Sequence, residues 1–270
     1  MVKPRAKKQF GQHFLEPAWA DKVLRAIDPK PDQVFVEIGP GPGALTRRLA
    51  AAAGAIVAYE IDRDLAAALE AEALPNVTVI RGDFLDADVD PRAAVAATRH
   101  PSSLRIAGNL PYNVASPILF KLRAMYRSGV TFADATVMLQ REVADRLVAK
   151  PGGREFGVLS VLMQHSAEVE RLLALPPGAF RPLPKVHSAL VRLRFHPAAP
   201  SVRDAALFDV VVQAVFTRRR KTLANALLAY PPAVQRTAAM VLQSANLDGR
   251  RRPETLSVEE FVRLADALVL

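Results

Sequence analysis

An apolar segment that ends abruptly at alternating glycines places the strongest constraint on the fold of this 270-residue chain. Residues 34–38, Val-Phe-Val-Glu-Ile, are typical of a parallel strand buried on both faces, and Gly39, Gly41 and Gly43 follow at once. A helical pattern over residues 44–49 comes next. Because glycines let a ligand approach the backbone and a helix N-terminus offers unpaired amides, this order predicts a nucleotide-binding corner.

A second apolar segment supports a ligand site at this corner, although glycine turns also end many ordinary strands. Residues 55–60 predict another buried strand, and its last residue, Glu60, comes 21 positions after Gly39. An acid at this place holds ribose hydroxyls in nucleotide-binding sheets. The glycine spacing differs from the dinucleotide fingerprint, and no P-loop is present. The segment from Glu37 to Gly43 resembles the cofactor loop of S-adenosylmethionine-dependent methyltransferases, with a dinucleotide as the second choice.

The order of the predicted elements indicates a parallel α/β sheet. Strands are expected at residues 77–80, 104–107 and 135–139, with helical patterns between them, which gives five β-α alternations. Asp83 follows the third strand, where it either accepts from an adenine amine or is a turn aspartate. We predict a Rossmann-like class I methyltransferase sheet.

The end of the chain differs in pattern from the sheet. Segments 167–175 and 189–195 predict a closing strand pair with an antiparallel edge. After a proline-containing linker, four helical patterns follow, at residues 204–217, 221–229, 233–244 and 258–268. The sequence therefore predicts two domains, residues 1–196 with a basic N-terminal arm, and a small all-helical domain, residues 197–270.

Composition limits the class of partner and the compartment. The formal net charge is +9 and the isoelectric point is about 10.2, which favours an acidic partner, nucleic acid being the commonest. The chain lacks cysteine, its five histidines show no metal-ligand spacing, and no apolar run reaches membrane-spanning length. We expect a cytoplasmic protein that binds no metal and no membrane.

The segment Asn109-Leu110-Pro111-Tyr112 suggests the chemistry. The 6-amino group of adenine is a poor nucleophile because its lone pair is delocalised into the ring. The Asn109 amide oxygen and the Leu110 carbonyl could accept both amine hydrogens and localise that lone pair. Pro111 stiffens the turn, and Tyr112 can stack on an extruded base. The alternative is an ordinary strand-to-helix turn in which asparagine caps and tyrosine packs.

Several motifs together resemble the small-subunit ribosomal RNA adenine dimethyltransferase family of the KsgA/Dim type over nearly the whole chain. The motifs lie at residues 11–15, 37–43, 60–62, 82–83, 109–113, 140–144, 180–186 and 216–223. The resemblance implies dimethylation of two adjacent adenines in the 3′-terminal hairpin loop of 16S ribosomal RNA, late in 30S assembly, with S-adenosylmethionine as cofactor. It assigns cofactor contacts to His13, Leu15, Gly39, Glu60, Asp83 and Asn109, to which the glycine loop adds Gly41. His13 stands where the family often has asparagine.

Further roles follow from combining the resemblance with the residue chemistry. Tyr112 and Phe180 are expected to sandwich the target base, although an aromatic beside prolines is more often core packing. The basic run of Arg218, Arg219, Arg220 and Lys221 is expected to contact RNA phosphates, with a solvated face as the alternative. We expect a monomer that acts on small-subunit ribosomal RNA or a 30S assembly intermediate.

Three alternatives to this function remain open at the level of sequence. One is the related large-subunit dimethylase of the antibiotic-resistance type, against which the Arg-Arg-Arg-Lys-Thr-Leu segment and the helical C-terminal domain argue. Another is a non-catalytic RNA-binding assembly factor, which the intact segment from Asn109 to Tyr112 disfavours. A dinucleotide oxidoreductase is third, because the glycine spacing does not fit and no acid-base residue is apparent near the strand ends.

Overall fold

The computed structural model describes residue 7 and residues 12–86, 104–230 and 237–269, which divide into two compact units. The first unit contains residues 1–144 and 169–195, and the second contains residues 145–168 and 196–270. The sequence predicts one boundary, near residue 197. In the structure the chain passes from the first unit to the second between residues 195 and 196. The segment Asp145–Glu168 also belongs to the second unit, together with the C-terminal helices.

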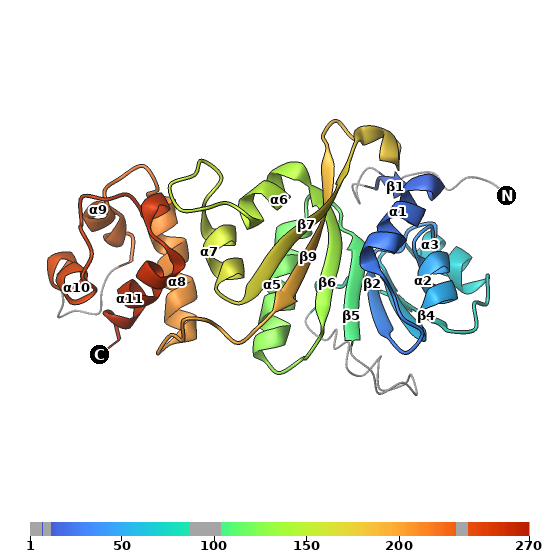
Figure 1. Cartoon of the computed structure of the whole chain (residues 1–270), viewed down its shortest axis with the longest axis horizontal. Helices are drawn as coiled ribbons and strands as arrows, with labels where there is room; N and C mark the ends of the chain where they lie inside the picture. The colour runs from blue at the N-terminus through green and yellow to red at the C-terminus, as the bar shows by residue number, and fades with distance from the viewer. Residues whose placement is uncertain (1–6, 8–11, 87–103, 231–236, 270) are drawn as a thin grey trace. The chain divides into compact units, whose positions relative to one another are not determined.

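The first unit is built on a seven-stranded sheet of order β4-β3-β2-β5-β6-β9-β7 (Figure 1). Its parallel part consists of β2 (Val34–Ile38), β3 (Ala55–Glu60), β4 (Val77–Arg81), β5 (Leu104–Asn109) and β6 (Asp134–Gln140). Strands β9 (Ser188–Phe195) and β7 (Ala167–Leu175) extend the sheet, and β9 pairs antiparallel to β6. The predicted Rossmann-like sheet is confirmed.

The central strands are buried along their whole length, which explains their continuous apolar sequences. Every residue of β2 and β3 is buried, because parallel neighbours flank them in the sheet and helices cover the faces. The segment 189–195, predicted as part of an antiparallel edge, instead forms the interior strand β9, since β7 forms the edge. Its apolar residues Leu190, Val191 and Leu193 are fully buried.

Helices connect the strands and pack on the core. In the first unit these are α1 (Pro17–Ile27), α2 (Thr46–Ala52), α3 (Arg63–Glu70) and α5 (Ala115–Arg127), with the start of α6 (Arg141–Leu147). Helix α1 turns Ala20, Val23 and Ile27 inward because they lie three or four residues apart. Asp62 caps α3 by accepting a hydrogen bond from the Asp64 amide.

A two-stranded sheet joins the two ends of the first unit's sequence. Strand β1 (Phe14–Leu15) pairs antiparallel with β8 (Phe180–Arg181), which follows the short 3₁₀ helix η2 (Pro177–Ala179). Leu15 and Phe180 are buried in the main hydrophobic core with residues of α1 and the sheet. This pairing fixes the segment around residue 13 beside the proline-rich segment 182–187.

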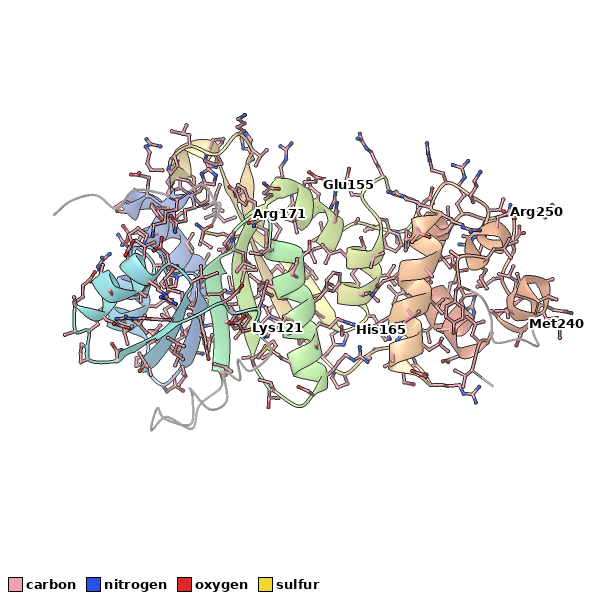
Figure 2. All side chains as sticks on the ribbon, turned by 180° about the vertical axis from the view of Figure 1, so that it is seen from behind. Lys121, Glu155, His165, Arg171, Met240 and Arg250 are labelled. Atoms are coloured by element: carbon pink, nitrogen blue, oxygen red, sulfur yellow. The ribbon has the colours of Figure 1, made fainter. Side chains whose placement is uncertain are left out.

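The second unit is helical in its described part. It contains α7 (Val158–Gln164), α8 (Ala205–Thr217), α9 (Leu223–Leu227), α10 (Ala238–Ser244), η3 (Pro253–Thr255) and α11 (Val258–Asp266). Ser257 and Glu260 form the capping box that begins α11, as their spacing predicts. The predicted helix 233–244 is observed from Ala238, and its first residues lie outside the described range. Figure 2 shows Met240 and Arg250 of this unit carrying their side chains outward.

Candidate active site

The reversal of strand order between β2 and β5 locates the site. The chain builds β3 and β4 on one side of β2 and then β5 and β6 on the other, so the loops after β2 and β5 diverge. Ligands bind in such a crevice at the carboxyl ends of parallel strands. Ile38 pairs with Gly108, so Gly39 and Asn109 are neighbours at this edge.

The glycine loop has a backbone that other residues would strain. Gly39 and Gly41 have φ of +68° and +56°, in the left-handed region that glycine adopts without cost. A Cβ atom on Gly41 would also lie 3.2 Å from the Phe14 ring. The glycines are therefore required both for the turn and for the close approach of β1.

Glu60 is buried at the end of β3 and faces the glycine loop. Its Oε2 accepts a hydrogen bond of 2.9 Å from the Gly41 amide, and its Oε1 accepts one of 2.8 Å from the Asp62 amide. Burial raises the pKa of Glu60, and the hydrogen bonds from Asp62 and Gly41 offset part of that rise. The carboxyl group thus lies beside the loop, as expected for a residue that binds ribose hydroxyls.

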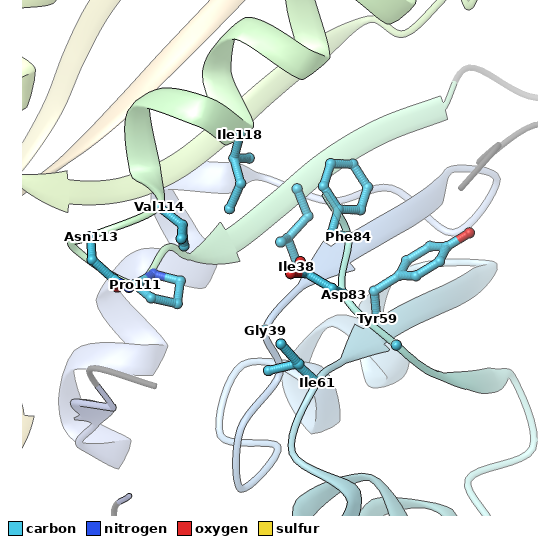
Figure 3. A pocket seen from close by; sticks show the side chains of 11 residues that line it. Ile38, Gly39, Tyr59, Ile61, Asp83, Phe84, Pro111, Asn113, Val114 and Ile118 are labelled. Atoms are coloured by element: carbon cyan, nitrogen blue, oxygen red, sulfur yellow. The ribbon is translucent and has the colours of Figure 1, made fainter. Parts of the chain in front are cut away.

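A cavity of about 310 Å³ opens between the ends of β2, β3, β4 and β5 (Figure 3). Its walls are mostly apolar, with Tyr59, Phe84 and Ile118 among them, and Asp83 contributes a carboxylate. Asp83 also accepts a hydrogen bond of 2.9 Å from the Leu85 amide, so it is a turn aspartate and a cavity residue at once. A flat aromatic ring with one amino group would suit this cavity.

A second cavity of about 70 Å³ adjoins the first, and both are lined by Gly39, Ile61 and Pro111. Polar groups are more frequent here: the lining includes Gln12, His13, Glu60, Asn109 and Tyr112. One cavity therefore suits a base and the adjoining one suits a charged, hydrogen-bonding ligand. The residues present fit S-adenosylmethionine, in which an adenosine is joined to a charged methionine.

His13 links Asn109 and Tyr112, the two residues of the Asn-Leu-Pro-Tyr segment whose side chains are predicted to be functional. Its carbonyl oxygen accepts a hydrogen bond of 2.7 Å from Asn109 Nδ2. Its ring stacks on Tyr112, with 5.3 Å between ring centroids and an angle of 26°. Its Nδ1 lies 2.7 Å from the Pro182 carbonyl oxygen, which can only accept, so Nδ1 carries the proton. His13 thus contacts Asn109 through its backbone and Tyr112 through its ring.

Contacts of Leu110 and Tyr112 hold the turn after β5 in place. Leu110 is buried, and its amide donates to the Met138 carbonyl at 3.2 Å. The Tyr112 hydroxyl lies 2.9 Å from the Ser188 hydroxyl, and burial raises the pKa of Tyr112, with the Ser188 hydrogen bond acting in the opposite direction. The sequence does not indicate this contact of Ser188, because a separation of 76 residues from Tyr112 leaves no local pattern.

A buried carboxyl group lies beneath the glycine loop. Glu37 is 2 % exposed, and its Oε2 has no hydrogen-bond partner among the described residues. It lines a small cavity of about 30 Å³ together with Leu15, Gly39, Gly41 and Asn109. Burial raises the pKa of Glu37 to about 7. The predicted cofactor residue Leu15 therefore lies beneath the glycine loop, in the same small cavity as Glu37.

Lys7 and Gln12 contact acidic residues beside the cofactor corner. Lys7 Nζ lies 2.7 Å from Asp62 Oδ1 and 2.7 Å from Asp64 Oδ2, and Gln12 Nε2 donates to Asp62 Oδ2 at 3.0 Å. Burial on its own would raise the pKa of Asp62, but the hydrogen bonds from Lys7 and Gln12 hold it below its ordinary value. Of the basic residues in the predicted arm, Lys7 is the one that the structure describes.

Phe180 requires a correction. The sequence predicts that its ring stacks on the target base, but the side chain is 0 % exposed and belongs to the hydrophobic core. The β1-β8 pairing turns it inward against Leu15 and α1. Core packing, the alternative for an aromatic beside prolines, accounts for its position.

The basic run 218–221 lies in the second unit at the turn between α8 and α9. Arg218, Arg220 and Lys221 are exposed. Arg219 differs, because its guanidinium donates to the Arg154 carbonyl at 2.6 Å and lies 3.9 Å from Glu254 Oε2. The run therefore presents three cations to solvent, while Arg219 holds the 150–155 loop.

Groups of acidic, histidine or cysteine side chains with metal-binding geometry are absent from the residues that the structure describes. Within the same residues, no helix has the length and apolar character needed to cross a membrane.

The chain is similar to known proteins over nearly its whole length. A model of the family described as "Ribosomal RNA adenine dimethylase" matches residues 3–265. The "Ribosomal RNA small subunit methyltransferase A" of Pseudomonas fluorescens is 41 % identical over 268 residues, covering 98 % of this chain and 94 % of the relative. That of Chromohalobacter salexigens is 44 % identical, covering 97 % and 91 %.

Solved structures share the fold. A dimethyladenosine transferase from Plasmodium falciparum superposes with a TM-score of 0.75 at 24 % identity, covering 93 % of this chain and 96 % of the other. The 23S ribosomal RNA methyltransferase ErmE superposes with a TM-score of 0.64 at 28 % identity, covering 94 % and 99 %. The fold is that of class I methyltransferases.

Proposed function

This chain belongs to the ribosomal RNA adenine dimethylase family, and from that premise we propose that it methylates two adjacent adenines of small-subunit ribosomal RNA. The adenines are those of the 3′-terminal hairpin loop, the methylated atoms are the 6-amino nitrogens, and S-adenosylmethionine is the cofactor. The name shared by the relatives that are 41 % and 44 % identical supports the choice of the small subunit.

The orientation of the Asn109 amide is the observation that carries the proposal. Because Asn109 Nδ2 donates to the His13 carbonyl, the amide oxygen is the end that remains to accept a hydrogen. Asn109 lies at the end of β5, where the polar cavity begins. An acceptor is what the amino group of adenine requires, since its nitrogen must keep its lone pair for the methyl group.

The residues of the turn then have distinct tasks. Asn109 Oδ1 and the Leu110 carbonyl accept the two amine hydrogens, which localises the nitrogen lone pair. Pro111 fixes the backbone between them, and Tyr112 stacks on the extruded base. Bound S-adenosylmethionine supplies an electrophilic methyl group on a sulfonium. No general base is needed, because the methylated ammonium is acidic and loses its proton to water.

The cofactor residues follow from the two cavities. Glu60 binds the ribose hydroxyls, and Asp83 accepts from the adenine amino group of the cofactor. Gly39 and Gly41 allow close approach of the backbone, His13 and Asn109 line the side of the methionine, and Leu15 lines the small cavity beneath the glycine loop. The burial of Glu60 and its contact with the Gly41 amide support this assignment.

The exposed cations of the basic run 218–221, in the second unit, are proposed to bind the RNA backbone. Arg218, Arg220 and Lys221 are exposed cations at one turn, in a chain of net charge +9. Such cations contact phosphates without reading sequence. The partner is then small-subunit ribosomal RNA or a 30S assembly intermediate, and we expect the enzyme to act in the cytoplasm as a monomer.

The test is methyl transfer from labelled S-adenosylmethionine to small ribosomal subunits that lack the modification. Wild type is compared with Asn109→Ala, and with Asn225→Ala as an exposed asparagine in the second unit. We expect label in two adjacent adenines of the 3′-terminal hairpin, lost with Asn109→Ala and retained with Asn225→Ala. Wild-type binding without transfer would refute the proposal and favour a non-catalytic assembly factor.

A second candidate is dimethylation of large-subunit RNA, which the likeness to the 23S enzyme ErmE at 28 % identity supports. The same assay with large ribosomal subunits distinguishes the two. Label confined to large-subunit RNA would replace the small-subunit proposal.

A further inference from the structure

Two exposed apolar side chains in the first unit have no part in the site described so far. Among the described residues of this unit, the large apolar side chains that are exposed are Ile61, Leu183 and Val186. Ile61 lines both cofactor cavities. Leu183 and Val186, 58 % and 41 % exposed, both lie in residues 182–187, which connect β8 to β9 and are called here the 182–187 loop.

Both ends of this loop are anchored to the neighbours of Tyr112. At the first end, the Pro182 carbonyl accepts from the His13 ring, which stacks on Tyr112. At the other end, Ser188 contacts the Tyr112 hydroxyl at 2.9 Å, and the His187 carbonyl accepts from the Arg141 amide. The middle of the loop is three residues from either anchor, so it lies within about 11 Å of one of them.

The chemistry of the loop suits a nucleic acid strand. Lys185 lies between the two apolar residues, and Arg181 precedes the loop; both side chains are exposed. Single-stranded RNA is bound by surfaces that combine cations for the phosphates with apolar or aromatic side chains for the unstacked bases. A purely apolar patch would suit a protein partner better, and the cations beside Leu183 and Val186 favour RNA.

We propose that the 182–187 loop binds a nucleotide that flanks the target adenine, with Leu183 and Val186 against its base and Lys185 against its phosphate. The inference rests on the proposed function, because it requires the target adenine to be delivered to Tyr112. An adenine extruded onto Tyr112 leaves its neighbour unstacked. The loop supplies an apolar surface where that neighbouring base emerges.

The experiment compares Leu183→Ser and Val186→Ser with two exposed controls in the second unit. Leu228→Ser matches the first variant, since Leu228 is 59 % exposed, and Val210→Ser matches the second, since Val210 is 50 % exposed. KM is measured separately for unmodified small subunits and for S-adenosylmethionine, and the melting temperature is measured by calorimetry. We expect KM for the subunit to rise about tenfold in the loop variants, because each replaces an apolar side chain that would be buried against a base by a polar one. KM for S-adenosylmethionine, the melting temperature and both controls should stay as in wild type.

A photo-crosslinking residue at position 183 separates RNA from protein as the occupant. Crosslinks to the RNA strand beside the target adenine would support the proposal, and crosslinks to a ribosomal protein alone would overturn it. It would also be overturned if the loop variants kept the wild-type KM for the subunit, or if the controls raised that KM equally. Failure of the proposed function is a different result, since wild type itself would then transfer no label.

Discussion

The hydroxyl groups of Tyr112 and Ser188 lie 2.9 Å apart, which connects the turn after β5 to the first residue of β9. Ser188 is 2 % exposed, so its hydroxyl has a fixed place. With the His13 ring against its face, Tyr112 is held at both its ring and its hydroxyl. This arrangement sets the plane on which a base would stack.

We expect Ser188→Ala and Tyr112→Phe each to lower kcat roughly fivefold, the effect of one hydrogen bond of about 1 kcal/mol. The double variant should be no worse than either single variant, because all three lack the same contact. Steady-state kinetics on unmodified subunits measures this, with the melting temperature as the check for unfolding. Additive losses would mean that the two hydroxyls act independently.

The Tyr112 hydroxyl gives a spectroscopic test of the same contact. The Ser188 hydrogen bond lowers the pKa of Tyr112 against the larger rise caused by burial. Ser188→Ala should therefore raise the pKa of Tyr112 further, which absorbance titration can detect among the four tyrosines of the chain. The signal is assigned by its absence in Tyr112→Phe. An unchanged titration in Ser188→Ala would show that the contact has no influence on the tyrosine.

Glu60 should determine cofactor affinity. In Glu60→Gln one carboxylate oxygen becomes an NH₂ group, which cannot accept from a ribose hydroxyl or from the Gly41 amide. Loss of a charged hydrogen-bond acceptor is expected to weaken S-adenosylmethionine binding by about tenfold or more. Titration calorimetry measures this. Glu170→Gln is the control, since Glu170 of β7 pairs with Arg194 of β9 and has no part in either cavity. Equal losses in both variants would refute the role of Glu60.

The sequence predicted those parts of the site that depend on neighbours in the chain. The strands at 34–38 and 55–60 are observed with the predicted bounds, because continuous apolar runs ended by a glycine or an acid specify both the strand and its end. Gly39, Glu60 and Asn109 meet at one edge because parallel strands place their carboxyl ends together.

Contacts between distant segments could not be predicted in this way. The pairing of Phe14 with Arg181 forms a sheet of two residues per strand, too short for any periodic pattern. That pairing buries Phe180 and brings His13 to Tyr112. The association of residues 145–168 with the C-terminal helices is likewise a matter of tertiary packing.

Glu37 should make stability depend on pH. Its pKa is about 7 in the folded protein and 4.5 as an ordinary glutamate, so between these values the folded state keeps a proton that the unfolded state has lost. Stability should therefore fall as pH rises from about 4.5 to about 7 and then level off, with a contribution of up to about 3 kcal/mol.

Glu37→Gln removes this contribution. Burial also raises the pKa of Glu60, which adds a slope of the same sign, so the difference between wild type and Glu37→Gln isolates Glu37. Urea denaturation across this pH range measures it. Parallel stability curves for the two proteins would contradict the buried, protonated state of Glu37.

Asp134 lies at the end of the sheet remote from the site. Of the buried charges there, its removal should lower the free energy of unfolding most. Its carboxylate pairs with Arg105 at 2.7 Å and with Arg192 at 3.3 Å, and both arginines also donate to carbonyl groups at the end of α1. Arg105 is 5 % exposed, so removing its partner leaves a buried cation without its counter-charge.

We expect Asp134→Asn to lower the free energy of unfolding by about 3 kcal/mol, because a charge left unpaired in a protein interior is costly. Asp28→Asn is the matched control: Asp28 pairs with Lys30 at 2.7 Å, but both side chains are more than half exposed. Such a surface pair contributes little to stability, because solvent screens both charges. Urea denaturation of both variants at pH 7 gives the comparison, and affinity for S-adenosylmethionine should be unchanged in each, since Asp134 lies at the amino end of β6, far from the glycine loop. A loss for Asp134→Asn no larger than that of the surface control would show that the arginines find other partners once the carboxylate is gone.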